Sequence, residues 1–219
     1  MPGKIRSAKA TVNTAKNNSS QASIEPLLDF FERLIPLNAK EKELITEKFH
    51  SRLYRKRQYV LQEGTLCNQL YFVVRGCLRM YKIDEKGNTH VLQFATENYW
   101  INDLGSFHGF KPSSLNIDAL EDTVVLQISR DDLVLVYQQA PKFDRIFRVL
   151  MENSFIRLQQ RLLQNISSTA EERYQSFLEL YPHLVNRLSQ VQVASFLGIT
   201  PEFLSRLRNR KKTSGTKKS

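Results

Sequence analysis

The chain of 219 residues is 41% hydrophobic, which is enough to bury the core of one large domain or of one large and one small domain. Short, interrupted apolar runs argue against a membrane span or a secretory signal. Two cysteines, Cys67 and Cys77, indicate a reduced, cytoplasmic protein without a disulfide framework or a four-cysteine iron–sulfur cluster. The net charge of +10 comes from the two ends, because residues 1–24 and 206–219 hold basic residues and no acid, and a basic C-terminal end is typical of a polyanion binder.

Two helices are predicted near the N-terminus. Residues 1–23 are rich in serine, asparagine, alanine and lysine and show no apolar period, so this segment is predicted to be disordered. From Ile24 the apolar residues recur at helical spacing as far as Ile35, and Pro36 ends the pattern. Asn38 is placed to cap the second helix.

Short strands follow from Tyr59 to about Ser129. Runs of β-branched and aromatic residues occupy positions 70–74, 77–83, 90–95 and 122–129. The segment DEKGN, residues 84–88, is typical of a hairpin turn. Closely spaced strands of this kind predict an antiparallel barrel or roll, and we assign residues 24–139 to this domain. The basic run at 52–58 is interpreted as one more strand with a solvated face, with contact to nucleic acid as the alternative.

A long helix is predicted over residues 140–167, beginning at Pro141. Its apolar residues recur every three or four positions over several turns and form a stripe wider than one packing surface needs. We therefore predict that the helix packs on its own roll and also joins two copies of the chain as a homodimer. The dimer residues expected are Phe147, Met151, Phe155, Leu158 and Leu162. Burial of the same helix within one subunit is the alternative.

Start and stop signals mark three further helices. They begin after Thr169, Ser189 and Thr200, the first two at capping boxes and the third with proline at its first position. Gly198 ends the middle helix, where a left-handed residue is needed, and Ala194 is small enough for a close helix crossing. The positions expected to face inward are Val193, Ala194, Leu197, Phe203, Leu204 and Leu207.

These features together predict a helix-turn-helix, in which two helices cross steeply and the second enters a DNA groove. We assign residues 168–212 to this domain and residues 213–219 to a disordered basic tail. The segment upstream is short and the chain ends soon after the second helix, so any wing of a winged-helix-like fold is expected to be short.

The outward face of the last helix carries groups that can read DNA. Glu202, Ser205, Arg206 and Asn209 share one stripe at helical spacing. Arg206 can bond the O6 and N7 of guanine, and Glu202 can accept from the N4 of cytosine. Phosphate contacts are expected from Ser189, Thr200, Arg208, Arg210, Lys211 and Lys212. A plain surface ion pair between Glu202 and Arg206 is the alternative.

Taken as a whole, the chain resembles the Crp/Fnr family of bacterial transcription regulators. EGTLCNQLYFVVRGCLRMY at 63–81 is similar to the family's roll segment, and LSQVQVASFLGITPEFLSRLR at 188–208 is similar to its DNA-binding segment. The resemblance implies an α+β chain with a sensor roll, a dimer helix and a helix-turn-helix. It further implies double-stranded DNA, a second copy of the chain and RNA polymerase as partners. The family's base-reading glutamate and arginine fall on Glu202 and Arg206, whereas a third reader falls on Pro201, so the operator is expected to differ.

The effector segment departs from the members that bind cyclic nucleotides. Their Gly-Glu-Leu motif corresponds to Asn102-Asp103-Leu104, followed by Gly105, and their Arg-Ser-Ala motif to Ser113-Ser114-Leu115. A serine cannot replace the arginine that holds the cyclic phosphate, so we expect cyclic AMP to bind weakly or not at all. The segment then serves an unidentified small-molecule effector or acts as scaffold, and no cofactor is assigned.

Two other classes of function are alternatives to a DNA-binding regulator. Small β-rolls are similar to cupins, which are metal enzymes, but the four histidines of this chain are scattered and show no paired ligand spacing. They are His50, His90, His108 and His183. The other class is a ligand-binding regulatory module that acts through protein partners, against which the basic tail and the stripe around Arg206 argue. We therefore expect a regulator and not an enzyme.

Overall fold

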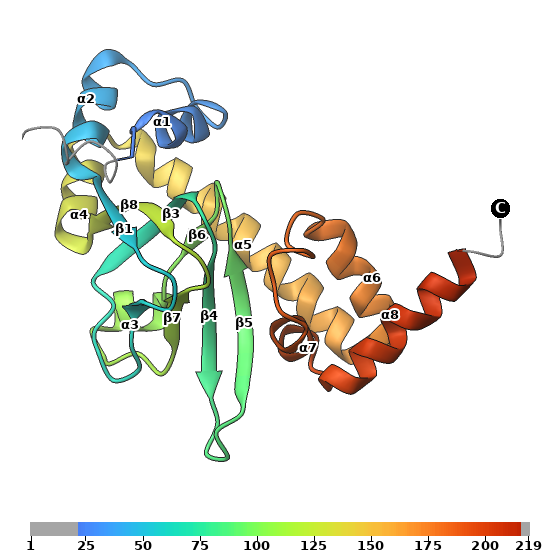
Figure 1. The fold of residues 1–219 in the computed structure, drawn as a ribbon. Coiled ribbons are helices and arrows are strands. Elements are labelled where there is room, and N and C mark those ends of the chain that lie inside the picture. Colours follow the sequence, from blue (N-terminus) through green and yellow to red (C-terminus); the bar gives the residue numbers. More distant parts are fainter. Residues whose placement is uncertain (1–21, 216–219) are drawn as a thin grey trace, which may run out of the picture.

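The computed structural model describes residues 22–215, with side chains up to Asn209. The expectation of disorder therefore falls largely outside the described part of the chain, as do the side chains of Arg210, Lys211 and Lys212. Between residues 22 and 215 no helix is both long and apolar enough to cross a membrane. Figure 1 shows a strand-rich body, a long helix beside it and a helical group at the C-terminal end.

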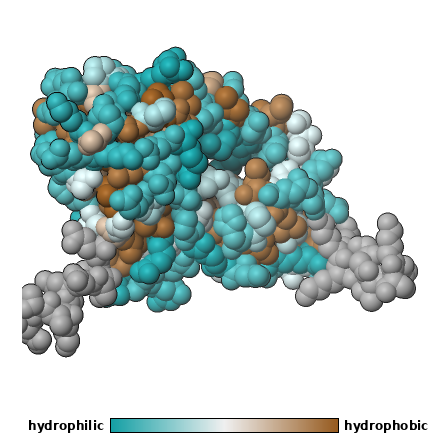
Figure 2. Space-filling view, turned by 90° about the horizontal axis from the view of Figure 1, so that it is seen from above, coloured by the Kyte–Doolittle hydropathy of each residue, from teal (hydrophilic) through white to brown (hydrophobic). Residues whose placement is uncertain are grey.

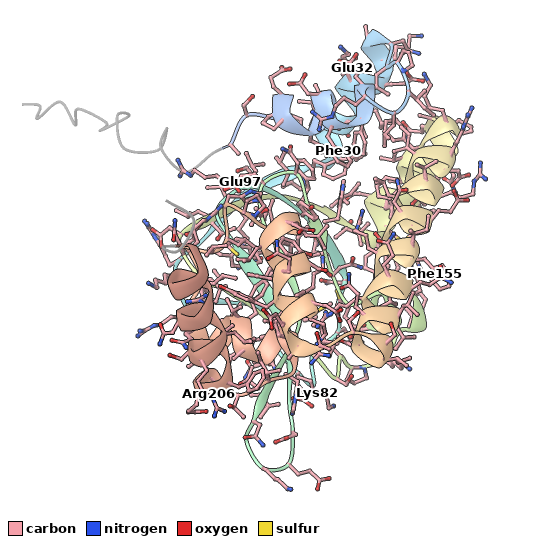
Figure 3. The ribbon with its side chains drawn as sticks, turned by 90° about the vertical axis from the view of Figure 1, so that its right-hand side faces the viewer. Phe30, Glu32, Lys82, Glu97, Phe155 and Arg206 are labelled. Atoms are coloured by element: carbon pink, nitrogen blue, oxygen red, sulfur yellow. The ribbon has the colours of Figure 1, made fainter. Side chains whose placement is uncertain are left out.

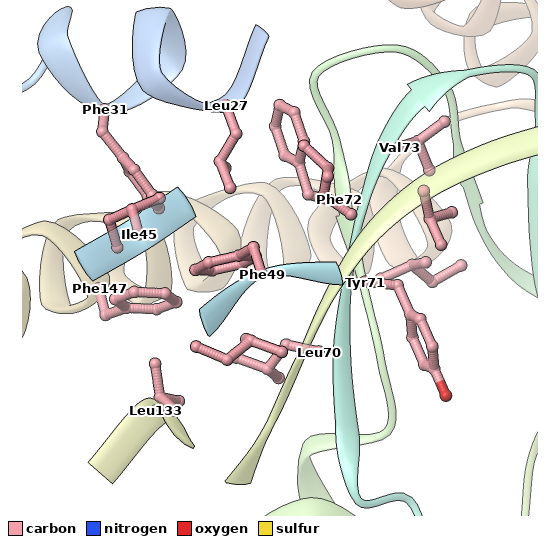
Figure 4. Close-up of a cluster of buried hydrophobic side chains, with 14 of the residues drawn as sticks. Leu27, Phe31, Ile45, Phe49, Leu70, Tyr71, Phe72, Val73, Leu133 and Phe147 are labelled. Atoms are coloured by element: carbon pink, nitrogen blue, oxygen red, sulfur yellow. The ribbon is translucent and has the colours of Figure 1, made fainter. Parts of the chain in front are cut away.

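Helices α1 (Glu25–Glu32) and α2 (Ala39–Lys48) cover one end of the roll. The predicted cap of the second helix is confirmed, because the Asn38 side chain accepts from the Glu41 amide at 3.0 Å and the Glu41 carboxylate accepts from the Asn38 amide at 2.8 Å. Apolar side chains of both helices join the strands and the start of the long helix in one core (Figure 4). In this core the ring of Phe31 packs edge-on against Phe143 at 5.3 Å.

Eight strands form two antiparallel sheets that make up the roll. In chain order they are β1 (His50–Tyr54), β2 (Tyr59–Leu61), β3 (Gln69–Arg75), β4 (Leu78–Ile83), β5 (Thr89–Ala95), β6 (Trp100–Ile101), β7 (Asn116–Ala119) and β8 (Thr123–Ser129). One sheet has the order β1-β8-β3-β6 and the other β2-β7-β4-β5. The four strands predicted from β-branched runs are confirmed, and the expected turn at Gly87 joins β4 to β5.

The prediction of one strand over residues 52–58 is wrong. Strand β1 ends at Tyr54 and the chain turns before β2. The cause is a left-handed residue, Arg57, with φ +70°, whose amide donates to the Ala119 carbonyl at 2.7 Å. Asp122 holds this turn from outside by accepting from the Lys56 amide at 2.9 Å. The basic run is thus a turn on the surface of the roll.

Three helices connect or follow the strands: α3 (Leu104–Gly109), α4 (Arg130–Gln139) and α5 (Lys142–Ser167). The long helix α5 begins at Lys142, one residue after the predicted start at Pro141, and it ends at Ser167 because Ser168 is extended. Phe147 is only 6% exposed and contacts Tyr137 and Trp100 in the core, so its assignment to a dimer surface is wrong. The first turns of α5 pack on the roll, and this packing buries the side chain.

The later turns of α5 present an apolar surface. Met151, Phe155, Leu158 and Leu162 are exposed, with Phe155 at 60%, and Ile166 at the end of the stripe is 76% exposed. In Figure 3 Phe155 points away from the rest of the chain. Figure 2 shows a face on which hydrophobic side chains form separate patches between hydrophilic ones. An exposed stripe of this length is unusual for an isolated subunit.

The C-terminal group consists of α6 (Ala170–Leu180), α7 (Gln190–Leu197) and α8 (Pro201–Gly215). The described residues after α5 contain no strand, so none of them forms a wing. Helix α8 extends away from the roll in Figure 1 and ends at Gly215. Residues 213–215, expected to belong to a disordered tail, are its last residues, because the sequence has no glycine or proline after Pro201 until Gly215.

Candidate nucleic-acid interface

Helices α7 and α8 meet through the turn that the sequence predicts. Gly198 adopts φ +67°, and the Ile199 amide donates to the Ala194 carbonyl at 3.0 Å, which closes the end of α7. Ala194 is fully buried, so the helices approach closely at that point. The Thr200 hydroxyl accepts from the Phe203 amide at 3.2 Å and caps α8. A hydrogen bond of 2.9 Å from the Gln190 side chain to the Pro201 carbonyl joins the starts of the two helices.

The prediction that Phe203 faces inward is wrong. Phe203 is 38% exposed, whereas Leu204 and Leu207 are buried as predicted. Residue 203 lies between the buried and the outward face of the helix, and its ring lies 5.5 Å from the guanidinium of Arg206. An apolar residue at such a boundary position can face either way, so spacing alone does not fix it.

The four proposed base-reading residues lie on one side of α8. Glu202, Arg206 and Asn209 are exposed, and Ser205 is half-buried. Figure 3 shows Arg206 at the outer surface of the helix. No element of the described chain covers the arginine, so its guanidinium can reach a base edge.

The carboxylate of Glu202 is held in its charged form. Hydrogen bonds from its own backbone amide and from the Thr200 hydroxyl lower the pKa of Glu202, and the nearby charge of Arg206 lowers it further. An ionised acceptor at the first turn of a helix is suited to a donor such as the amino group of cytosine.

The proposed phosphate contacts fall into different surroundings. Ser189 and Thr200 are exposed, and both hydroxyls also cap a helix. Arg208 turns toward α6, where its Nε donates to the Tyr174 hydroxyl at 3.1 Å. Its Nη2 is buried without a partner in the described structure. Arg208 is therefore directed back toward the body of the domain and lies apart from the outward stripe.

The effector segment is closed by its own hydrogen bonds. Asp103 accepts from the Ser106 amide at 3.2 Å through one oxygen and from the Ser113 hydroxyl at 2.7 Å through the other. Ser113 is 3% exposed, in contrast to Leu104, Gly105 and Ser114, which face solvent, while Asn102 is half-buried. The acid and the serine that stand in the two motif positions thus bind each other.

Two other observations bear on what this segment can hold. Arg130 lies near α3, but its guanidinium packs over the ring of Phe110 at 3.9 Å and donates to the Cys67 carbonyl at 3.3 Å. Among the described residues, no three histidine, cysteine or acidic side chains are grouped so that they could hold a metal.

We expect Asp103→Ala to lower the free energy of unfolding by about 1–2 kcal/mol, because it removes the cap of α3 and leaves the buried Ser113 hydroxyl without this acceptor. Urea unfolding followed by circular dichroism measures the change. Ser114→Ala, at an exposed position of the same segment, is the matched control and should unfold like the parent. Equal stability of Asp103→Ala and the parent would contradict a structural role for Asp103.

Comparisons with known proteins agree with this geometry. The sequence profile of the cyclic nucleotide-binding domain family matches residues 51–140, which span the roll. The Electron transport regulator A of Shewanella oneidensis is 24% identical over 196 residues, covering 82% of this chain and 76% of that protein. A putative transcriptional regulator of the Crp/Fnr family from Eubacterium rectale superposes with a TM-score of 0.64 at 19% identity, covering 85% of this chain and 89% of the other. The chain therefore has the fold of a Crp/Fnr regulator.

A second solved structure has a similar fold along most of its length. FixK2 from Bradyrhizobium japonicum superposes with a TM-score of 0.67 at 23% identity, covering 76% of this chain and 86% of FixK2.

The chain also has contacts between its domains that the sequence did not predict. The Arg161 guanidinium, on α5, donates to the carbonyls of Val91, Leu92 and Phe196, and it stacks on the Phe196 ring at 4.0 Å. The Ser195 hydroxyl, on α7, accepts from the Val91 amide at 3.0 Å and donates to the Thr89 carbonyl, also on β5. Helix α7 is thereby docked on strand β5.

A second group of charges joins the same two domains. Arg187, in the loop before α7, donates to Glu97 at 3.1 Å and also to Glu121. Burial raises the pKa of Glu97, but hydrogen bonds from Arg187 and from backbone amides outweigh this effect, so its pKa is lowered. The carboxylate is therefore charged at neutral pH and supports the docking.

We expect Arg161→Gln to loosen this docking. Its shorter neutral side chain would leave partly buried carbonyls of β5 and α7 without their charged donor, and each hydrogen bond of this kind contributes about 1.5–3 kcal/mol. Hydrogen exchange by mass spectrometry should become faster in peptides covering 89–93 and 195–198. Arg145→Gln, at an exposed arginine of the same helix, should leave these rates unchanged. Unchanged exchange in Arg161→Gln would show that the arginine does not hold α7 on β5.

Proposed function

We propose that this chain acts as a homodimer that binds a specific, roughly palindromic DNA site to regulate transcription. Residues 24–139 form the sensor roll, residues 140–167 the dimer helix and residues 168–212 the DNA-binding domain. Each copy places α8 in the major groove, one helical turn away from its twin. Arg206 and Glu202 read bases, helped by Ser205 and Asn209.

The observation that carries this proposal is the outward face of α8. An uncovered arginine and an ionised glutamate, one helical turn apart, project from a helix fixed by two caps and a left-handed glycine. A rigid support of this kind positions side chains for base recognition better than a loop does. Arg210, Lys211 and Lys212, which follow in the sequence, supply phosphate contacts.

The apolar stripe of α5 supports the homodimer. A second copy of the same helix, packed against Phe155, Leu158 and Leu162, would remove this surface from water and would place the two α8 helices around a twofold axis. The stripe begins only after Phe147, where the helix leaves its own core.

The roll segment around Asp103 is proposed to be a degenerate cyclic-nucleotide pocket. Its acid is occupied by Ser113 and by the cap of α3, and the arginine of the nucleotide-binding members is replaced by that same serine. We infer that cyclic AMP is not its ligand. Changes of state in the roll would reach the DNA-binding domain through the break at Ser168, between α5 and α6.

A salt titration with random duplex DNA tests the assignment to DNA. Affinity should fall by about 10³-fold or more between roughly 50 and 200 mM salt if at least six phosphates are contacted. The double variant Lys211→Ala/Lys212→Ala should lower the slope by about one for each lysine that contacts a phosphate. Absence of binding at low salt, or binding that does not depend on salt, would overturn the proposal.

A further inference from the structure

Phe203 is an exposed aromatic side chain on the helix that we propose to enter the groove. It lies in the first turn of α8, and it is 38% exposed, whereas Leu204 and Leu207 of the same helix are buried. The core of the DNA-binding domain is thus closed over the two leucines, while part of the Phe203 ring stays in water. Burial of this remaining surface against a partner would be favourable.

The ring lies at the edge of the outward stripe of α8. Residues three positions apart share a face of a helix, so Phe203 lies beside Arg206, whose guanidinium carbon is 5.5 Å from the centre of the ring. Leu207, four positions after Phe203, is buried, which places the ring between the core and the stripe. A base edge bonded by Arg206 therefore has the Phe203 ring next to it.

The backbone that carries Phe203 is held in place. Its amide donates to the Thr200 hydroxyl at 3.2 Å in the helix cap, and the Gln190 side chain donates to the Pro201 carbonyl at 2.9 Å. A phenylalanine has only two side-chain torsion angles, so it loses little conformational freedom on binding. Residues of the first turn are also those with which a recognition helix contacts base edges. Phe203 thus has the position and the rigidity that a base contact requires.

The major groove offers such a ring one kind of apolar group. All four bases present hydrogen-bonding groups there, and thymine alone adds a methyl group, on C5, which phenylalanine side chains contact in other complexes. Three residues of an α-helix rise by about 4.5 Å and successive base pairs lie about 3.4 Å apart, so two residues at this spacing reach neighbouring base pairs.

We propose that Phe203 determines specificity by contacting the methyl group of a thymine, at the base pair next to the guanine bonded by Arg206. The inference rests on the proposed entry of α8 into the major groove, and it adds a third reader to Arg206 and Glu202. Each half-site then contains a thymine that is selected by burial of an apolar group and not by a hydrogen bond.

The test replaces thymine by deoxyuridine, which lacks only the C5 methyl group. The full-length parent protein first selects duplexes from a random pool, and each thymine of one selected half-site is then replaced singly. We expect one replacement, next to the guanine whose preference is lost in Arg206→Ala, to weaken binding about fourfold, the loss expected for one buried methyl group. Deoxyuridine placed between the half-sites is the matched control and should leave the affinity unchanged.

A protein variant then identifies the side chain that contacts the methyl group. Phe203→Ala should bind the thymine and deoxyuridine duplexes with equal affinity and should keep the preference for the guanine. Phe110→Ala, which removes an exposed phenylalanine of the roll, should keep the parental difference between the two duplexes. Circular dichroism and thermal unfolding verify that both variants are folded.

Three results would overturn the inference. In the first, no deoxyuridine within the half-site weakens binding by the parent. In the second, a folded Phe203→Ala protein keeps the parental difference, since another residue would then contact the methyl group. In the third, Phe203→Ala loses only the preference for the guanine, which would assign the ring to positioning Arg206. A parent protein that selects no sequence at all would instead overturn the proposed function, so the two failures are distinguishable.

Discussion

An Arg206→Ala protein is expected to lose about 1–3 kcal/mol of discrimination at one base pair of each half-site while retaining most of its affinity for random duplex DNA. The reason is that Arg206 is exposed on the outer face of α8 and can form a two-pronged contact to guanine, whereas contacts to phosphates supply most of the affinity for DNA of any sequence. Selection of bound duplexes from a random pool, beside the parent, should show one position losing its preference.

The matched control is Arg145→Ala, which removes the same charge from an exposed site on α5. It should select the parental sequence. The salt dependence of binding separates two roles for Arg206: loss of a base contact leaves the slope nearly unchanged, and loss of a phosphate contact lowers it by about one. A selected sequence that is unchanged in Arg206→Ala would end the assignment of this residue to base reading.

The second large effect is expected from Leu162→Glu. Leu162 is 58% exposed within the apolar stripe of α5, and a carboxylate there would have to be buried between two copies of the helix. The dimer should therefore separate into monomers, which sedimentation equilibrium measures directly. Binding to a palindromic site should weaken by about 10²–10⁴, because the two DNA-binding domains are no longer linked.

The control for this variant is Asn153→Glu. Asn153 is exposed on the same helix, on the side opposite the stripe, so it introduces the same charge without entering the dimer surface. This protein should remain dimeric. If Leu162→Glu has the same mass in solution as the parent, the stripe is not the dimer interface. The apolar stripe would then have to be covered by something other than a second copy of the helix.

Sequence reasoning succeeded where a short segment determines its own structure. The caps at Asn38, Ser189 and Thr200 and the left-handed Gly198 lie within a few residues of the groups they satisfy, so local spacing is sufficient to predict them. The strands of the roll followed from β-branched runs for the same reason. The stripe on α8 could also be predicted, because residues at helical spacing share a face.

Sequence reasoning failed where packing between distant segments determines the position of a residue. Phe147 is taken by the roll core, and the turn at Arg57 is stabilised by contacts to 119–122, which no local pattern reveals. Arg187 finds Glu97 and Glu121 across 90 and 66 positions. Arg161 left a signal that could have been used: it lies on the same side of α5 as the buried Phe143, where a lone cation is unexpected.

Strand β5 is the last strand of its sheet, so one side of it has no neighbouring strand to bond with. In this structure Ser195 and Arg161 occupy backbone groups of that side. A movement that carried α7 away would expose an unpaired edge, and unpaired edges recruit strands from other molecules. Variants that undock the helix should therefore precipitate or form fibrils sooner than the parent on storage. Any natural undocked state should accordingly be short-lived, or should have the edge of β5 covered by another group.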